Sequence, residues 1–181
     1  NGTVALDIAL KTIGIKKNDE VIMPAMSYFS SASSVSYQNA TPVFIDIENN
    51  SFNLDPNKIQ SAISKKTKAI MFIDYGGNPS NFKKIKQIAK KNNLIVIQDG
   101  AQSLGAKKNN EPLGNNGDIS TMSFHMAKIM TTVEGGMIFT NNKKYYNEAL
   151  IRRNIGEPEN NKYHHVLLGT NARMTEIQAS I

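Results

Sequence analysis

The sequence predicts an α/β domain in which helices cover both faces of a mostly parallel sheet. Six short apolar runs recur along the 181 residues, and helical patterns separate most of them. The runs do not alternate between polar and apolar residues, which is typical of strands buried on both faces. Alternating strands and helices favour a parallel sheet. We therefore expect a three-layer α/β/α architecture with a mixed, mostly parallel central sheet.

The expected strands are short and rich in β-branched residues. They are Val21–Met23, Pro42–Ile45, Ala69–Ile73, Leu94–Ile97, Ile119–Phe124 and Met137–Phe139. The loop His125–Gly135 between the last two has no pattern of helix length. A parallel pair needs a longer crossover, so we expect the sheet to be mixed at this end.

Helical spacing of apolar residues predicts the connections between the strands. The expected helices are Tyr28–Tyr37, Pro56–Ile63, Phe82–Lys90 and Lys143–Arg153. Asp55 and Pro56 form a favourable N-cap and N1 pair. Another helix begins on the turn Asn1–Thr3, and a last helical pattern ends the chain at Ile181. Because both ends fall inside helical patterns, we expect residues 1–181 to be a fragment of a longer chain.

Composition argues against several classes of protein. Cysteine is absent, and the three histidines (His125, His164, His165) show no His-x-x-x-His spacing, so we expect no metal site. The net charge is +6, but the lysines are scattered in pairs without interleaved aromatic residues, so we expect no nucleic-acid partner. No run of about 18 apolar residues and no signal-peptide pattern occurs, so we expect a cytoplasmic protein without a membrane partner.

Two charged residues follow expected strands at the edge where ligands bind in α/β sheets. Asp99 follows Leu94–Ile97, and a carboxylate that has lost water there needs a positive partner. Lys128 follows Ile119–Phe124 and has apolar neighbours, and a desolvated lysine can form a Schiff base. Taken alone, Asp99 is more often a helix cap or a structural ion pair, and a lone lysine is usually a solvated surface charge.

Other residues complete a set that suits one cofactor. The turn at Gly2 and Thr3 offers free N–H groups and a helix dipole to a phosphate, and Ser123 adds a hydroxyl. Tyr28 is able to stack on a planar ligand. Taken singly, residues 1–3 are explained by an ordinary N-cap turn, and Tyr28 is explained by a position in the core. Together with an amine and a carboxylate, they are what pyridoxal phosphate requires.

At these residues the sequence resembles the fold-type I pyridoxal-phosphate enzymes, and more narrowly the DegT/DnrJ/StrS family of sugar aminotransferases. The resemblance covers essentially the whole chain. The motifs that carry it are Asn-Gly-Thr at 1–3, Gly-Ile-Lys-Lys-Asn-Asp-Glu-Val-Ile at 14–22, Pro-Val-Phe-Ile-Asp-Ile at 42–47, Asp-Gly-Ala-Gln-Ser at 99–103, Ser-Phe-His-Met-Ala-Lys at 123–128, Glu-Gly-Gly at 134–136 and Asn-Ala-Arg-Met-Thr-Glu-Ile-Gln-Ala at 171–179.

The resemblance implies catalytic roles for two residues and cofactor contacts for two more. Lys128 would bind pyridoxal phosphate as a Schiff base and then shuttle a proton. Asp99 would keep the pyridine nitrogen protonated. Gln102 would hydrogen-bond to the phenolic oxygen of the cofactor, and Tyr28 would stack on its ring.

The resemblance also implies how the phosphate is held. Gly2, Thr3 and Ser123 would bind it within one subunit. Asn171 and Arg173 would reach the phosphate in the partner's site, which makes the expected enzyme an obligate homodimer. Relatives carry additional N-terminal residues and a smaller C-terminal domain, so we expect residues 1–181 to form the cofactor-binding large domain and to be inactive alone.

Three positions depart from the pattern of the family. Gly100 stands where alanine is common, and Val133 stands where glycine is common. Asp74 stands where relatives often have histidine, and this change is expected to affect contacts with the substrate.

The activity implied by the resemblance is transamination from glutamate or glutamine to a nucleotide-linked keto-sugar, in the synthesis of amino sugars for surface polysaccharide such as lipopolysaccharide. One alternative is a sugar dehydratase, although such relatives have histidine in place of Lys128. Enzymes that form aminocyclitols or aminobenzoate share the motifs and stay open. A cofactor-binding regulatory protein without turnover is the alternative from another class. A nicotinamide dehydrogenase is disfavoured, because no Gly-x-Gly-x-x-Gly motif follows an expected strand.

Overall fold

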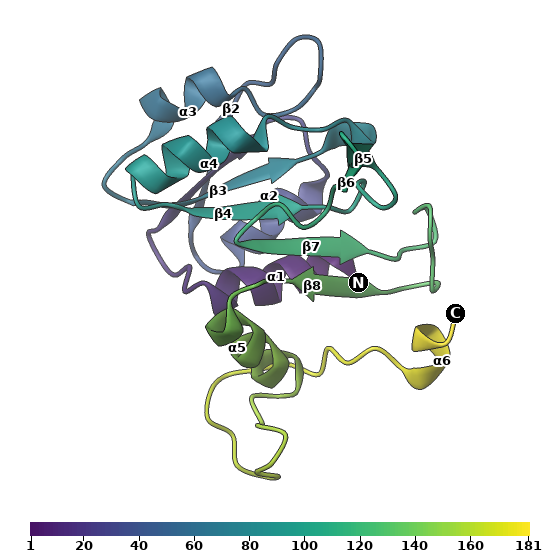
Figure 1. Ribbon diagram of the computed structural model, residues 1–181. Helices are drawn as coiled ribbons and strands as arrows, with labels where there is room; N and C mark the ends of the chain where they lie inside the picture. Colours follow the sequence, from purple (N-terminus) through teal and green to yellow (C-terminus); the bar gives the residue numbers. More distant parts are fainter.

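A six-stranded sheet forms the middle layer of the computed structural model, which describes all residues 1–181 (Figure 1). Its strand order is β2–β1–β3–β4–β7–β8. The strands are β1 (Glu20–Pro24), β2 (Thr41–Ile45), β3 (Thr67–Ile73), β4 (Ile95–Asp99), β7 (Ile119–Ser123) and β8 (Gly136–Phe139). The first five strands are parallel, and β8 pairs antiparallel to β7. The predicted mixed, mostly parallel α/β sheet is therefore confirmed.

Helices lie on both faces of this sheet (Figure 1). They are α1 (Gly2–Thr12), α2 (Phe29–Ser36), α3 (Pro56–Ala62), α4 (Phe82–Lys91), α5 (Lys143–Arg153) and α6 (Glu176–Ala179). Each lies where the sequence predicts a helix. Two short features are not predicted by the sequence, because neither has an apolar period: the hairpin of β5 (Lys107–Lys108) and β6 (Glu111–Pro112), and the 3-10 turn Tyr75–Gly77.

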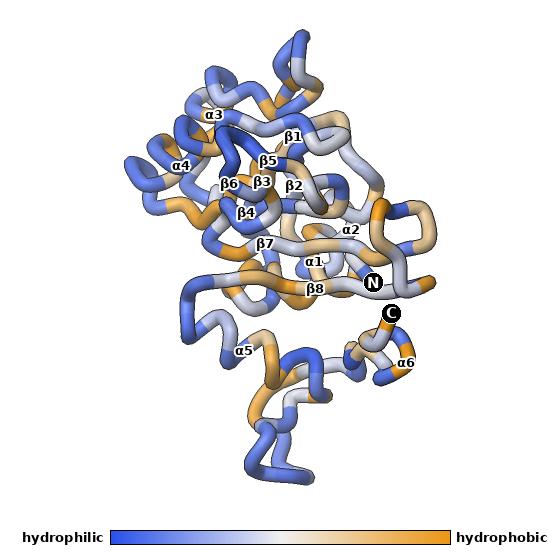
Figure 2. Tube along the Cα trace, turned by 45° about the vertical axis from the view of Figure 1, so that its right-hand side comes forward, coloured by the Kyte–Doolittle hydropathy of each residue, from blue (hydrophilic) through white to orange (hydrophobic).

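Alternate residues of the same strands supply two separate cores. Val21 and Met71 point to the face covered by α1 and α2, whereas Ile22, Ile70 and Phe72 point to the face covered by α3 and α4. Both sets are fully buried. This double burial is why the strands are continuously apolar in the sequence. In Figure 2 the outer turns of α3 and α4 are mostly hydrophilic, as expected for the solvent side of the outer layer.

The helix starts follow from local capping. The side chain of Asn1 accepts a hydrogen bond from the N–H of Val4, and that of Asp55 accepts from Asn57 next to Pro56. Asn81 and Asn142 cap α4 and α5 in the same way. These caps fix where each helix begins, including α1 at the carboxyl edge of the sheet.

The last part of the chain runs outside the sheet. After α5 it forms a long excursion and returns to α6 beside the loop between β7 and β8 (Figure 1). The amide of Gln178 donates to the carbonyl oxygen of Glu134 at 2.8 Å, which fastens α6 to that loop. None of the helices is long and apolar enough to span a bilayer.

Candidate active site

The carboxyl ends of the neighbouring strands β4 and β7 bring Asp99 and Ser123 to one edge of the sheet. The loop that follows β7 carries Lys128, and the N-terminus of α1 brings Gly2 to the same edge. Residues that are far apart in the sequence thus meet where α/β sheets usually bind ligands.

Asp99 is a buried carboxylate that takes part in no salt bridge. Its Oδ2 accepts a hydrogen bond of 2.7 Å from the hydroxyl of Ser31, and its Oδ1 accepts one of 3.2 Å from the N–H of Ala101. Burial raises the pKa of Asp99 above its ordinary value, and these two bonds and the charge of Lys128 oppose the rise only in part.

The raised pKa has a consequence for stability. Folding favours the protonated form of Asp99, so this carboxyl stabilises the protein at low pH, and that contribution is lost as the pH rises through the raised pKa. A cation placed against the carboxylate at neutral pH would offset the cost. The site is therefore suited to a ligand that carries a positive charge at this point.

Lys128 lies in a loop that is closed at its base by backbone hydrogen bonds. The N–H of Phe124 donates to the carbonyl of Gly135 at 2.8 Å, and that of Thr132 donates to the carbonyl of Phe124 at 3.0 Å. The N–H of Lys128 donates to the carbonyl of His125. Since Lys128 is partly exposed and forms no salt bridge, its amine is open to a ligand, and its charge reaches Asp99.

The first turn of α1 makes a cradle for an anion together with Ser123. The N–H groups of Gly2 and Thr3 belong to this turn and have no partner inside the helix. A Cβ atom on Gly2 would lie 2.8 Å from the Cβ of Ser123, so only glycine lets the helix end come this close. A Cβ atom on Gly136 would in turn clash with the carbonyl of Asn1. Two N–H groups, a hydroxyl and a helix dipole therefore meet at one point.

The first turn of α2 closes the other side of the site. The hydroxyl of Thr3 lies 2.6 Å from that of Ser30, which ties α1 to α2. Tyr28, the N-cap residue of α2, is 74% exposed. A tyrosine at this place in a sequence is more often part of the core, but the ring of Tyr28 is exposed. The ring is therefore free to cover a ligand.

Gln102 is held in one orientation by the backbone. Its Oε1 accepts a hydrogen bond of 2.6 Å from the N–H of Gly76. Because the oxygen is used in this way, the Nε2 group is left as the donor toward a ligand. The glycine at position 76 has a φ of 60°, which favours a residue without a side chain.

Asp74 is almost completely buried and belongs to an internal network. Its carboxylate accepts from the N–H of Ser80 at 2.8 Å, the amide of Gln98 at 2.6 Å and the hydroxyl of Ser103 at 3.3 Å. These bonds lock the Tyr75–Gly77 turn against β4. Asp74 thereby helps to hold the backbone that orients Gln102, and its expected effect on contacts with the substrate stays a prediction.

Asn171 and Arg173 stand apart from the other predicted site residues. Asn171 forms a β-bridge with Asn154, and Arg173 donates to the side chain of Asn154 at 2.5 Å. Both line a cleft of about 600 Å³ between α1, β8, α5 and the segment 170–174. Neither side chain hydrogen-bonds to Asp99, Lys128 or Ser123.

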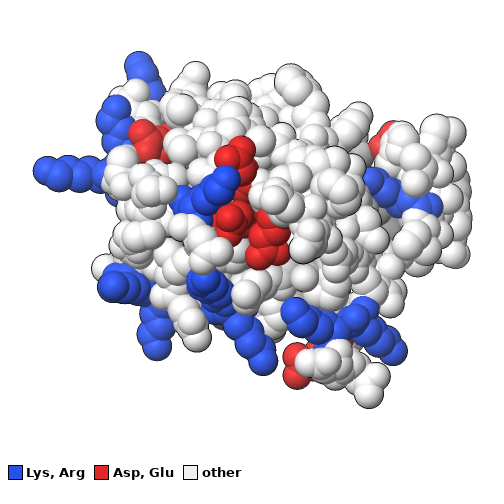
Figure 3. Space-filling model, turned by 90° about the horizontal axis from the view of Figure 1, so that it is seen from above, with Lys and Arg blue, Asp and Glu red and all other residues white.

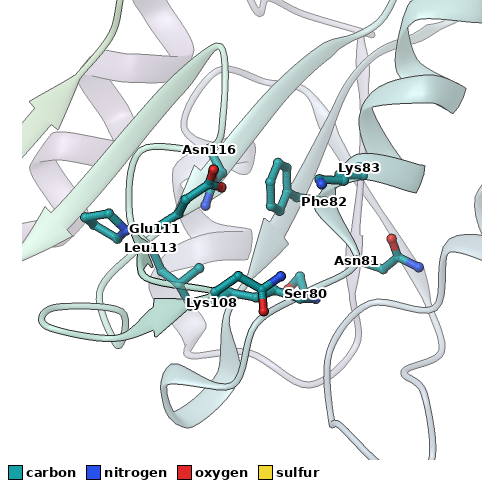
Figure 4. Close-up of a pocket in the computed structure, with 10 residues that line it drawn as sticks. Ser80, Asn81, Phe82, Lys83, Lys108, Glu111, Leu113 and Asn116 are labelled. Atoms are coloured by element: carbon teal, nitrogen blue, oxygen red, sulfur yellow. The ribbon is translucent and has the colours of Figure 1, made fainter.

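A smaller hollow of about 90 Å³ lies between the start of α4 and the β5–β6 hairpin (Figure 4). None of the predicted site residues lines it. In Figure 3, lysine and arginine side chains are spread around the visible face and form no continuous band, and a few acidic residues gather near its centre. No group of three His, Cys, Asp or Glu side chains is placed to bind a metal.

Sequence reasoning missed two residues of the site. Ser31 was hidden in the serine-rich segment 30–36, where several hydroxyls looked equivalent. Gly76 lies in the Tyr75–Gly77 turn, which has no apolar period that would predict it. Both residues are identified only by contacts between segments that are distant in sequence, Ser31 with Asp99 and Gly76 with Gln102.

Comparison with known proteins identifies the family of the chain. The DegT/DnrJ/EryC1/StrS aminotransferase family matches residues 1–181. The chain belongs to this family. It is 42% identical over 181 residues to the GDP-perosamine synthase of Escherichia coli O157:H7. The alignment covers 100% of this chain and 50% of the relative. It is 39% identical over 182 residues to a pleiotropic regulatory protein of Geobacillus stearothermophilus, with 100% of this chain and 48% of the relative covered.

A solved structure gives the same result. The crystal structure of NtdA from Bacillus subtilis, with bound cofactor PMP, has a TM-score of 0.93 and 34% sequence identity, over 99% of this chain and 41% of that one. The chain thus spans about half the length of the curated relatives that it matches.

Val133 is a strained residue in the loop that carries Lys128. Its φ is 68°, a conformation that β-branched residues rarely adopt and that costs about 1–2 kcal/mol. We expect Val133→Gly to raise the free energy of unfolding by up to about 1 kcal/mol, since the chain entropy of glycine offsets part of the relief. Chemical denaturation measures this change. Val133→Ala keeps a Cβ atom and serves as the control, with a smaller gain. A lower stability for Val133→Gly would contradict the strain.

Proposed function

We propose that the protein is a pyridoxal-phosphate-dependent aminotransferase that moves an amino group from glutamate or glutamine to a nucleotide-linked keto-sugar. The observation that carries the proposal is the buried Asp99 carboxylate, with its raised pKa, facing the site that Lys128 and the α1 cradle complete. The names of relatives support it, since one at 42% identity is a GDP-perosamine synthase. Residues 1–181 would be the large, cofactor-binding domain.

The residues present fit pyridoxal phosphate at each of its polar groups. The carboxylate of Asp99 lacks an ion pair, and a protonated ring nitrogen would supply one. A Cβ atom on Gly2 would fill the space between the start of α1 and Ser123. Because Gly2 has no side chain, a phosphate could come close to the backbone N–H groups of Gly2 and Thr3. A solved relative holds PMP, the amine form of the same cofactor.

Pyridoxal phosphate supplies an aldehyde that combines with amines and a ring that accepts electrons. Asp99 would hold the proton on the ring nitrogen. Lys128 would bind the aldehyde carbon and, once displaced by the donor amine, would carry the proton between the substrate carbon and the cofactor. Gln102 would donate its Nε2 proton to the phenolic oxygen. Tyr28 would cover the ring and exclude water from it.

The phosphate would be bound by the N–H groups of Gly2 and Thr3 and by the hydroxyl of Ser123. We further propose that Asn171 and Arg173 complete the phosphate site of a second subunit in a homodimer. Exposed apolar side chains near the site support association, because Phe29 is 77% exposed and Ile129 is 84% exposed. A cytoplasmic location and a role in surface polysaccharide, including lipopolysaccharide, are part of this proposal.

A regulatory protein is the second candidate function, because one relative at 39% identity is named a pleiotropic regulatory protein. The intact set of Lys128, Asp99 and Gln102 favours catalysis over it. A regulatory protein has no need of a free amine beside a cofactor site. A sugar dehydratase is disfavoured by the same lysine.

Borohydride trapping tests the aminotransferase. The full-length protein is incubated with pyridoxal phosphate, reduced, digested and mapped by mass spectrometry. We expect a pyridoxyl group on the peptide that contains Lys128, since this is the amine at the site. Addition of glutamate before reduction is expected to abolish the adduct by converting the cofactor to its free amine form.

Lys128→Arg is the matched control, because it keeps the charge that acts on Asp99 but cannot form the adduct. Absence of the adduct from folded wild-type protein would sink the proposal. An adduct that persists with every amino donor, and no product from any nucleotide-linked keto-sugar, would favour the regulatory candidate.

Mixed dimers test the sharing of sites between subunits. Lys128→Ala and Asn171→Ala subunits are each expected to be inactive or nearly so. When the two variants are co-expressed, half of the dimers contain one subunit of each variant. In each mixed dimer, one of the two sites has both an intact Lys128 and an intact Asn171. We expect roughly a quarter of the wild-type activity, as closed two-fold symmetry requires. Activity of the mixture no higher than that of the two pure variants would show that Asn171 serves the site of its own chain.

A further inference from the structure

Ser31 is the buried residue whose side chain reaches Asp99 directly. It lies in the first turn of α2 and has no solvent exposure. Its Oγ donates to Oδ2 of Asp99 at 2.7 Å, and the Oγ of Ser27 lies 2.6 Å behind it. Ser27 is only partly buried. The two hydroxyls form a chain from the rim of the site to the carboxylate.

The number of protons fixes the direction of this chain. A serine hydroxyl carries one proton, and that of Ser31 is used on Asp99. With Ser31 donating to Asp99, the proton between the two serines comes from Ser27, whose hydroxyl also lies 3.1 Å from the carbonyl oxygen of Tyr28. Asp99 accepts at both of its oxygens, from Ser31 and from the N–H of Ala101. Both bonds favour the ionised form of the carboxyl, because they are made to the oxygens that carry its negative charge.

We infer that Ser31, oriented by Ser27, is a positioning residue that keeps the Asp99 carboxylate ionised and turned toward the ring nitrogen of the cofactor. The inference rests on the proposed function for its biological meaning. Each oxygen of Asp99 keeps a second lone pair, so the two existing bonds fix the group without using up its capacity to accept from a ligand.

The surroundings of Asp99 make this hydroxyl important. Burial raises the pKa of the carboxyl, and the bond from Ser31 is the strongest influence in the opposite direction. The N–H of Ala101 follows, and Lys128, on the loop after β7, is the charged group that acts on Asp99. On the neighbouring strands, the register partners of Asp99 are the uncharged residues Ile73 and Thr121.

The test is a titration of Asp99 in the full-length protein without cofactor. The carboxyl carbon is followed by NMR as the pH is changed, and its signal is assigned by its loss in Asp99→Asn. We expect Ser31→Ala to move the midpoint up by about one pH unit, since a hydrogen bond to the charged form lowers the pKa of a carboxyl. Ser31→Thr keeps the hydroxyl and is expected to restore the wild-type midpoint.

Ser34→Ala is the matched control. Ser34 lies on the same helix and is equally buried, but its hydroxyl donates only to the carbonyl of Ser31, at 3.0 Å. The midpoint should not move in this variant. Ser27→Ala removes a partly exposed hydroxyl and should give a smaller upward shift, which keeps the test valid if Ser31→Ala does not fold.

An unchanged midpoint in every folded Ser31 and Ser27 variant would overturn the inference. This result is independent of the trapping experiment, because no cofactor is present in the titration. A shifted midpoint without an adduct on Lys128 would leave the role of Ser31 standing and remove the proposed function. An adduct with unshifted midpoints would do the reverse.

Discussion

The cost of burying the Asp99 carboxylate is the constraint around which the site is arranged. The group ends a strand in the middle of the sheet, where water is excluded and the pKa of the carboxyl is raised. Within the chain it receives two hydrogen bonds and the field of one lysine, but no ion pair. A buried carboxylate in this condition is costly for a protein that binds nothing there, and favourable for one that binds a cation.

The fold supplies the other parts of the site through the geometry of its strand ends. Parallel pairing of β4 and β7 sets Asp99 beside the strand that ends at Ser123. The antiparallel return of β8 lets Gly136 pass close to Asn1, which brings the start of α1 against Ser123. The pairing of the strands therefore places a carboxylate, an amine and an anion cradle along one edge of the sheet. These groups are far apart in the sequence. At the same edge, apolar side chains such as Ile129 are exposed.

Much of this arrangement is predictable from the sequence, because it depends on local patterns. Continuous apolar runs identified all six strands of the main sheet, and the short His125–Gly135 loop identified the antiparallel one. The placement of Asp99 and Lys128 after strands, together with the resemblance to a family, gave the candidate site. The strain at Val133 is also local, since its φ of 68° is a conformation that suits glycine better than a β-branched residue.

What the sequence could not predict depends on contacts between distant segments. The bond from Ser31 to Asp99 joins residues 68 positions apart, and nothing local distinguishes Ser31 from its serine neighbours. The enclosure of Asp74 by Ser80, Gln98 and Ser103 likewise depends on contacts between segments that no local pattern connects. Asn171 lies in a β-bridge with Asn154, away from Asp99 and Ser123, and no contact within the chain assigns it to a phosphate.

The most direct measurement compares the unfolding temperature of full-length wild type and Asp99→Asn, with and without pyridoxal phosphate, at a pH where Asp99 is ionised. We expect the asparagine variant to be at least as stable as wild type without cofactor, because a buried charge is removed. We also expect the cofactor to raise the unfolding temperature of wild type well above that of the variant, since binding to the folded state alone stabilises it. Equal stabilisation of both proteins by the cofactor would contradict the pairing of Asp99 with a cationic ligand.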